Sequence, residues 1–218
     1  AVMGVTDESG DARIFATKLA TEFENRGGEI RTNCRVTDFI SQNGYVQGVT
    51  TEQGDISADR VVLSSGVASK ALAKKIGITI PVLPIKGYSV TVPIIDESRV
   101  PISSCTDLKH RLVISRLGMR LRVAGFAEIG SDKACDAGRA AAARDRLEAL
   151  FPDAADYQSF DNWMGFRPMT PDGAPIIGEA ETLRNLWFNT GHGTLGWTLS
   201  HGTAQLLRDM MAGRKTAL

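Results

Sequence analysis

Cysteine is scarce in this sequence, and the few cysteines lie far apart. Cys34, Cys105 and Cys135 are odd in number and form no Cys-x-x-Cys pair. This distribution argues against a disulfide framework and against a zinc site, and it suits a reducing compartment. An excess of charge is also lacking, because 25 Lys and Arg residues balance 25 Asp and Glu residues. Nothing in this balance indicates a nucleic-acid partner.

Long apolar runs and several familiar motifs are missing too. No stretch approaches the ~18 apolar residues needed to span a bilayer, and no signal peptide opens the chain. These absences favour a cytoplasmic protein whose membrane contact, if it has any, is peripheral. A Gly-x-Ser-x-Gly element is absent, which argues against a hydrolase.

The composition is that of an ordinary globular protein, with 218 residues of which 43% are hydrophobic and 23% charged. Apolar spacing predicts helices over Asp11–Arg26 and Val67–Ile76, with Ser9 or Asp11 as the first N-cap. Asn43-Gly44 predicts a tight hairpin inside a three-stranded meander. A short apolar strand over 60–66 then ends in Ser64-Ser65-Gly66, where α/β proteins place ligands.

The pattern changes after Pro81. Residues 86–93, 102–105, 112–116 and 121–126 alternate like strands of an antiparallel sheet, and residues 137–151 read as a covering helix. The sequence therefore predicts a mixed α/β protein. Its expected divisions are residues 1–80, an inserted β-rich module over 81–161, and a return to the first domain over 162–218.

Two signals near the end of the chain carry the strongest indication of function. Gly165-Phe166-Arg167-Pro168 places an arginine in an expected Pro-flanked turn, and His192 follows Arg167 by 25 positions within Thr190–Thr198. There an expected strand ends in a glycine-rich loop, and an expected helix begins directly after it. The free N–H groups at such a helix start favour the binding of an anion beside a cofactor. Gly191-x-Gly193-x-x-Gly196 fits the dinucleotide pattern, but no second strand with a ribose-binding acid follows it.

The last helix has an apolar stripe at helical spacing. We expect Trp197, Met210 and Met211 to pack in the core, because such stripes usually point inward. Arg208 lies in its last turns, and Gly213 is suited to end it.

Taken together, these residues resemble the FAD-dependent D-amino-acid oxidase superfamily, and within it bacterial D-amino-acid dehydrogenases of the small-subunit type. The resemblance covers the chain from end to end and corresponds to the C-terminal half of such enzymes. The matching segments, in order, are Ser9-Gly10-Asp11, Val36, Val61–Gly66, Pro84-x-Lys86-Gly87-Tyr88, Gly165–Pro168, Met169–Gly178 and Gly191-His192-Gly193.

The resemblance implies a role for each matching site residue. Arg167 would bind the substrate carboxylate through its guanidinium fork, and Tyr88 would line the substrate pocket, although a strand tyrosine packed in the sheet is the equal alternative. The backbone of Val36 would meet the adenine side of FAD, and Gly66 would approach the dinucleotide. The residues expected along the flavin pyrimidine edge are His192, Gly193, Thr194, Leu195, Gly196, Trp197 and Thr198.

The implied reaction oxidises a D-amino acid to a 2-oxo acid and ammonia by hydride transfer to FAD, with electrons passed to a quinone or another acceptor. The enzyme would work in the cytoplasm, in possible peripheral contact with the inner membrane. We interpret His192 as a loop residue rather than a base, because hydride transfer needs orientation more than proton abstraction. We expect no metal, and we read His110 and His201 as structural or surface residues.

Two alternatives stay open. A glycine- or sarcosine-type amine oxidase that uses oxygen would have the same features, because access to the flavin decides the acceptor. A non-catalytic binding module or inactive fragment is the alternative from another class. The segment with the family's true dinucleotide fingerprint is absent from this sequence, so we expect this chain alone to bind FAD weakly and to lack activity.

Overall fold

The computed structural model describes residues 8–130 and 134–216, and within them the chain forms two compact units. Unit 1 comprises the described residues up to Glu29 together with Lys86–Phe166. Unit 2 comprises Ile30–Ile85 and the described residues from Arg167 onward. In this division the first helix groups with the β-rich segment instead of with the residues that follow it, and that segment covers Lys86–Phe166 instead of the expected 81–161.

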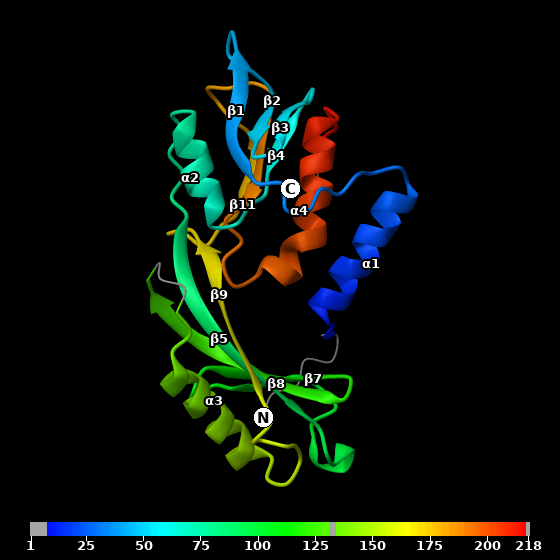
Figure 1. Cartoon of the computed structure of the whole chain (residues 1–218), viewed down its shortest axis with the longest axis vertical. Helices are drawn as coiled ribbons and strands as arrows, with labels where there is room; N and C mark the ends of the chain where they lie inside the picture. Colours follow the sequence, from blue (N-terminus) through cyan, green and yellow to red (C-terminus); the bar gives the residue numbers. More distant parts are fainter. Residues whose placement is uncertain (1–7, 131–133, 217–218) are drawn as a thin grey trace. The chain divides into compact units, whose positions relative to one another are not determined.

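Unit 1 is built on a five-stranded sheet with the order β6-β7-β8-β5-β9. Figure 1 shows α3 lying along this sheet. Ala140, Ala143 and Leu147 of α3 pack with buried strand residues such as Leu121 and Val123 to form the core of the unit. The elements are β5 (Leu83–Pro93), a 3-10 turn (Glu97–Arg99), β6 (Cys105–Asp107), β7 (Leu112–Leu117), β8 (Arg120–Ile129), α3 (Ala137–Leu150) and β9 (Asp161–Met169).

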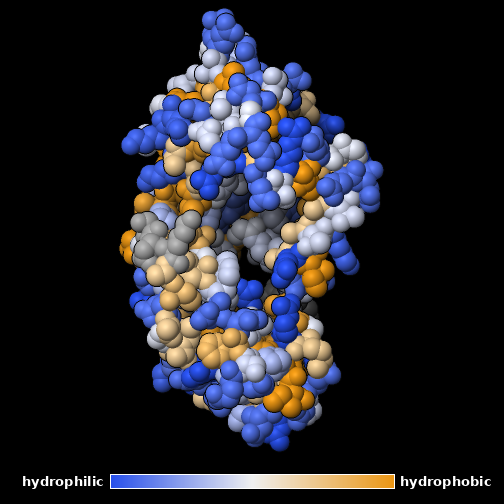
Figure 2. Space-filling view, in the orientation of Figure 1, coloured by the Kyte–Doolittle hydropathy of each residue, from blue (hydrophilic) through white to orange (hydrophobic). Residues whose placement is uncertain are grey.

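The first helix, α1 (Ala12–Asn25), also belongs to unit 1. Its N-cap is Asp11, whose carboxylate accepts hydrogen bonds from the backbone N–H groups of Arg13 and Ile14, as a short acidic side chain at this position does. The apolar residues Ile14, Phe15, Leu19 and Phe23 stay about half exposed. In Figure 2 apolar residues reach the surface among polar ones. The helical spacing thus predicts the helix but not the burial of its face.

Unit 2 combines two small sheets with two helices. Its β4 and β11 run parallel, and β10 pairs antiparallel with β11 on the other side. In Figure 1, α2 and α4 flank these strands. A second core joins Leu63, Ala73, Leu186 and Phe188. The elements are β1 (Val36–Gln42), β2 (Tyr45–Thr51), β3 (Gly54–Ser57), β4 (Val61–Leu63), α2 (Ala68–Lys75), β10 (Ile176–Glu179), β11 (Leu186–Thr190) and α4 (Gly196–Met211).

The mixed α/β class, the meander with its Asn43-Gly44 turn and the antiparallel sheet are confirmed. Both turn residues have positive φ, 52° and 81°, as a two-residue hairpin loop requires.

Three local predictions are wrong. The strand expected over 102–105 is instead β6, at Cys105–Asp107. Arg167 and Pro168 lie in strand β9, not in a turn. A proline is tolerated there because β9 is the edge strand of its sheet and needs no donor on its outer side. Trp197 does not pack in a core, since it is 45% exposed. It lies in the first turn of α4, whereas the buried residues of that helix are Thr203 and Leu207.

Candidate functional site

Two neighbouring strand ends in unit 2 carry the loops that the sequence singles out. The parallel strands β4 and β11 pair through Leu63 and Phe188, and each is followed by a glycine-containing loop. Parallel strands in α/β proteins place their ligands at their carboxyl ends. The loops that start at Ser64 and Gly191 therefore lie at the edge of the sheet where a ligand is expected.

A chain of hydroxyl groups joins these two loops. The Oγ atoms of Ser65 and Ser69 are 3.2 Å apart, and Ser69 Oγ is 3.0 Å from Thr190 Oγ1. Thr190 Oγ1 also donates to the carbonyl oxygen of Gly66 at 3.3 Å. Because Ser69 and Thr190 are buried, these bonds fix the loops to each other. Sequence reasoning missed this network, since its members lie 121 positions apart.

The glycines of the second loop permit a close approach of the chain to itself. Gly191 and Gly193 have φ values of 79° and 55°, which L side chains rarely adopt. A Cβ at Gly193 would lie 2.8 Å from Met169 Sδ, and one at Gly191 would lie 2.9 Å from Thr170 Cγ2. The Gly193 N–H donates to the Pro168 carbonyl oxygen at 2.9 Å. The fold thus brings the glycine loop against the segment that directly follows Arg167.

Helix α4 begins at Gly196 with its first turn uncapped. Its N-cap is Leu195, and no side chain in the described part of the protein caps the helix there. The first N–H groups of a helix lack intrahelical partners and carry partial positive charge. Leu195 and Trp197 are 52% and 45% exposed, so this helix start is accessible and suited to a group that carries or gains negative charge.

Arg167 is half-buried, and burial lowers the pKa of its guanidinium because the charge is partly removed from water. The group stays protonated at neutral pH, since arginine does not lose its proton in proteins. A cation in a partly dehydrated environment interacts strongly with an anion. The Arg167 side chain can therefore grip a carboxylate with two parallel hydrogen bonds.

His192 is held by α4. Its Nε2 atom is 3.1 Å from Thr203 Oγ1, and the Thr203 hydroxyl donates to the Ser200 carbonyl oxygen at 3.3 Å. With that hydroxyl proton committed to Ser200, Nε2 is the donor to Thr203. Burial also lowers the pKa of His192. These contacts support the interpretation of His192 as a residue that orders the loop.

Tyr88 is placed differently from the other candidates. It lies in unit 1, it is 2% exposed, and its hydroxyl donates to Glu128 Oε2 at 2.9 Å. Its ring meets Phe126 edge-on at 6.1 Å between centroids, and burial together with Glu128 raises its pKa. This environment favours the packing alternative, because a side chain so enclosed has no surface left for a substrate. We therefore leave Tyr88 out of the proposed site.

The remaining cofactor candidates lie in unit 2. Val36 is the first residue of β1 and pairs with Thr51, and Gly66 follows β4 with a φ of 58°. Within residues 8–130 and 134–216 no group of His, Cys, Asp or Glu side chains could hold a metal ion. Over the same residues no helix is long and apolar enough to cross a membrane.

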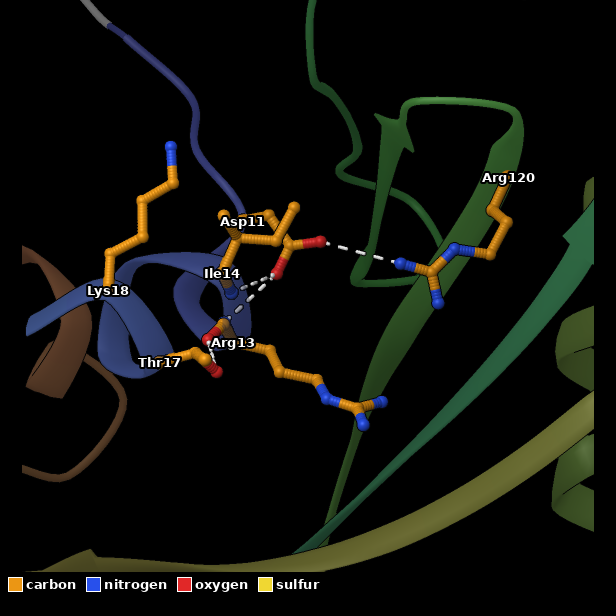
Figure 3. Close-up of a pocket in the computed structure, with 6 residues that line it drawn as sticks. All are labelled: Asp11, Arg13, Ile14, Thr17, Lys18 and Arg120. Carbon is orange, nitrogen blue, oxygen red and sulfur yellow. Dashed lines mark hydrogen bonds and ion pairs between the residues drawn. The ribbon is translucent and has the colours of Figure 1, made fainter. Parts of the chain in front are cut away.

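A pocket in unit 1 contains none of these candidates. It is lined by α1 and by Arg120 of β8, and Figure 3 shows the Asp11 carboxylate directed at the Arg120 guanidinium. One oxygen of Asp11 caps α1, and the other pairs with Arg120 at 3.4 Å. Asp11 thus fixes α1 to the sheet of unit 1, and we read this pocket as a product of that contact.

Comparison with known proteins identifies the family. A family model described as FAD dependent oxidoreductase (DAO) matches residues 4–210. The chain belongs to this family. A D-amino acid dehydrogenase of Paramagnetospirillum magneticum is 44% identical over 213 residues, which are 97% of this chain and 50% of that protein. A D-amino acid dehydrogenase of Granulibacter bethesdensis is 42% identical over 96% of this chain and 50% of its own length.

Solved structures of family members share the fold. The glycine oxidase of Geobacillus kaustophilus superposes with a TM-score of 0.81 at 27% identity, covering 93% of this chain and 54% of that one. The iminodiacetate oxidase of Chelativorans sp. BNC1 gives a TM-score of 0.82 at 20% identity, covering 94% and 56% of the two chains. The chain spans about half the length of the curated relatives it matches.

Proposed function

We propose that the natural protein carrying this chain oxidises D-amino acids to 2-oxo acids and ammonia with FAD as its cofactor. The observation that most directly supports this proposal is the contact of the glycine loop with the segment after Arg167. The Gly193 N–H donates a hydrogen bond to the Pro168 carbonyl oxygen there. That contact joins the residue after the half-buried Arg167 to the loop that leads into the start of α4. The identity of 42–44% with D-amino acid dehydrogenases supports the choice of substrate class.

The residues of unit 2 fit the cofactor. Gly66 has a positive φ, and the space where its Cβ would lie is open, while the uncapped start of α4 offers N–H donors. In the proposed site, the loop from His192 to Thr198 lies along the flavin pyrimidine edge, with Val36 and Gly66 toward the dinucleotide. FAD, when bound, supplies the hydride acceptor.

Arg167 performs the orienting step in this proposal. A bidentate grip on the substrate carboxylate fixes the direction of the Cα–H bond. The backbone N–H groups at the start of α4 stabilise negative charge as it develops on the acceptor. Loss of a hydride from Cα of the neutral amine leaves an imino acid, and water hydrolyses it to the 2-oxo acid and ammonia. No side chain of this chain need act as the base.

The unit boundaries and the electron acceptor complete the proposal. We assign unit 2 to the FAD-binding part of the protein and the sheet of unit 1 to its substrate-binding part. We assign a quinone or another carrier as the acceptor, and we place the protein in the cytoplasm with peripheral contact to the inner membrane. The word dehydrogenase in the names of the relatives supports an acceptor other than oxygen.

An oxygen-using amine oxidase is the second candidate. It is favoured by the likeness to the Geobacillus kaustophilus glycine oxidase, at a TM-score of 0.81. The rates at which oxygen and a quinone reoxidise the reduced natural protein, compared by stopped-flow absorbance, distinguish the two. Faster reoxidation by quinone supports the dehydrogenase.

Arg167→Ala in the natural protein tests the carboxylate role. We expect kcat/KM for D-alanine to fall by roughly two orders of magnitude or more, because the substrate loses both its anchor and its orientation. FAD content, read from the visible absorption, should not change. Arg184→Ala is the matched control, since Arg184 is an exposed arginine of unit 2 paired with Glu179. Unchanged kinetics in Arg167→Ala would rule out the proposed role.

A further inference from the structure

Among the arginines of β7, β8 and α3, one has no acidic partner in the described part of the chain. Six arginines lie on β7, β8 and α3, and five of them pair with a carboxylate. The five pairs are Arg116 with Glu97, Arg120 with Asp11, Arg139 with Glu128, Arg144 with Asp145, and Arg146 with Asp107. The sixth, Arg122, has no such partner within 4.0 Å among residues 8–130 and 134–216.

Arg122 lies on the face of the sheet that turns away from α3. Its neighbours in β8, Leu121 and Val123, are both fully buried in the core beneath α3, and alternate residues of a strand point to opposite faces. Its register partner on β7 is Ser115. Val113, which shares this face with Ser115, is 44% exposed, so solvent reaches this side of the sheet.

The guanidinium of Arg122 is held in place but not neutralised. It donates to Ser89 Oγ at 2.9 Å, and Ser89 itself is 3% exposed. Its Cζ atom lies 5.8 Å from the centre of the Trp163 ring. The Nε atom is buried and has no hydrogen-bond partner among the described residues. A half-buried cation with an unused donor costs free energy unless an anion completes it.

We propose that Arg122 binds the carboxylate of a small organic acid on this face of the sheet. The guanidinium fork matches a carboxylate, Ser89 fixes the orientation of the fork, and the exposed ring of Trp163 offers an apolar surface for the body of the ligand. Arg122 belongs to unit 1, whereas Arg167 belongs to unit 2. Whether the organic acid is the amino-acid substrate itself rests on the proposed function, and the two arms below treat these questions separately.

The first arm measures binding without turnover. Tryptophan fluorescence of the natural protein is titrated with propionate, with its neutral isostere propionamide, and with inorganic phosphate. The response of Trp163 is assigned by difference from Trp163→Phe. We expect saturation with propionate only, and a half-saturating concentration raised roughly tenfold or more in Arg122→Gln, since a charged hydrogen bond is lost.

Arg120→Gln is the matched control, because Arg120 lies two residues earlier on the same strand and is already paired with Asp11. It should titrate like the unaltered protein. Circular dichroism checks the fold of each variant, and Arg122→Lys, which keeps the charge but not the fork, replaces Arg122→Gln if the latter fails to fold. An Arg122 variant that titrates normally, a Trp163 signal that propionate leaves unchanged, or tighter binding of propionamide or phosphate would overturn the proposal.

The second arm identifies the source of the carboxylate. Suppose that the fluorescence titration supports the site. A KM for D-alanine that is raised severalfold in Arg122→Gln then identifies the amino-acid substrate as the ligand. An unchanged KM makes the ligand a separate organic acid. If the natural protein oxidises no D-amino acid, the proposed function fails, and the fluorescence arm still decides the binding site.

Discussion

Asp107 illustrates how single residues stabilise unit 1. Its Oδ2 atom accepts from Arg146 Nε at 2.8 Å and lies 2.8 Å from His110 Nδ1. Burial raises the pKa of the Asp107 carboxyl, but the hydrogen bonds from Arg146 and His110 lower this pKa by more. The net result is a pKa of about 2, compared with the usual 3.8. The ionised carboxylate therefore connects β6, the turn after it and α3. His110 thus has a structural partner.

The pKa of Asp107 predicts a pH dependence. The pKa of Asp107 is lower in the folded protein than in the unfolded chain. The ionised carboxylate therefore stabilises the folded state at pH above about 4, and this stabilisation is lost as pH falls toward 2. We expect Asp107→Asn to lower the free energy of unfolding near pH 7. The difference from the unaltered protein should shrink as pH falls from 4 to 2. Urea unfolding at a series of pH values measures it, and a difference that does not vary with pH would contradict this account.

Candidate residues for the site could be chosen from the sequence, but the burial and the contacts of these residues could not be predicted. Gly165-Phe166-Arg167-Pro168 and Gly191-His192-Gly193 are local patterns that point to Arg167 and its glycine loop. Burial depends on residues distant in sequence. Tyr88 is enclosed by Glu128 and Phe126, and Arg122 has no acidic partner among the described residues. Neither feature has a local signal in the sequence.

Helix α4 and the loop before it show how the backbone conformation decides whether a position requires glycine. The loop needs glycine because its backbone takes a positive φ against Met169. Within α4, Gly202 has no such requirement, since a Cβ there meets nothing within 4 Å. We therefore expect glycine to stabilise the fold at position 193 and to destabilise it at position 202, only nine residues later.

Two glycine substitutions test this contrast. We expect Gly193→Ala to lower the free energy of unfolding by about 1–2 kcal/mol, the cost of a left-handed backbone for an L side chain. Gly202→Ala should raise it by about 0.5–1 kcal/mol, because alanine loses less backbone entropy in a helix. Chemical denaturation compares the two variants. Equal effects, or a stabilising Gly193→Ala, would refute the packing described for the loop.

Most helices and hairpins could be predicted because their signals are local. Asp11 caps α1, Asp136 caps α3, and Asn43-Gly44 forms its turn. Strand β9 could not be predicted, because a proline inside a strand is compatible only with a sheet edge, and the edge is a property of the assembled sheet. The burial of Trp197 was predicted wrongly because helical periodicity does not say which turn of α4 faces a core.

At the scale of the whole chain, the sequence indicated the family. Family membership follows from the match over residues 4–210. The grouping of α1 with unit 1 could not be predicted, because it depends on contacts such as Asp11 with Arg120, which are 109 positions apart. The roles of the two units in binding FAD and substrate are proposals that follow from the site.

The visible absorption spectrum of the natural protein, recorded before and after anaerobic addition of D-alanine, tests the central claim most directly. This account predicts flavin bands that D-alanine bleaches and that an equal concentration of L-alanine leaves unchanged. A colourless protein that binds no added FAD, or flavin bands that no D-amino acid bleaches, would contradict the proposed function.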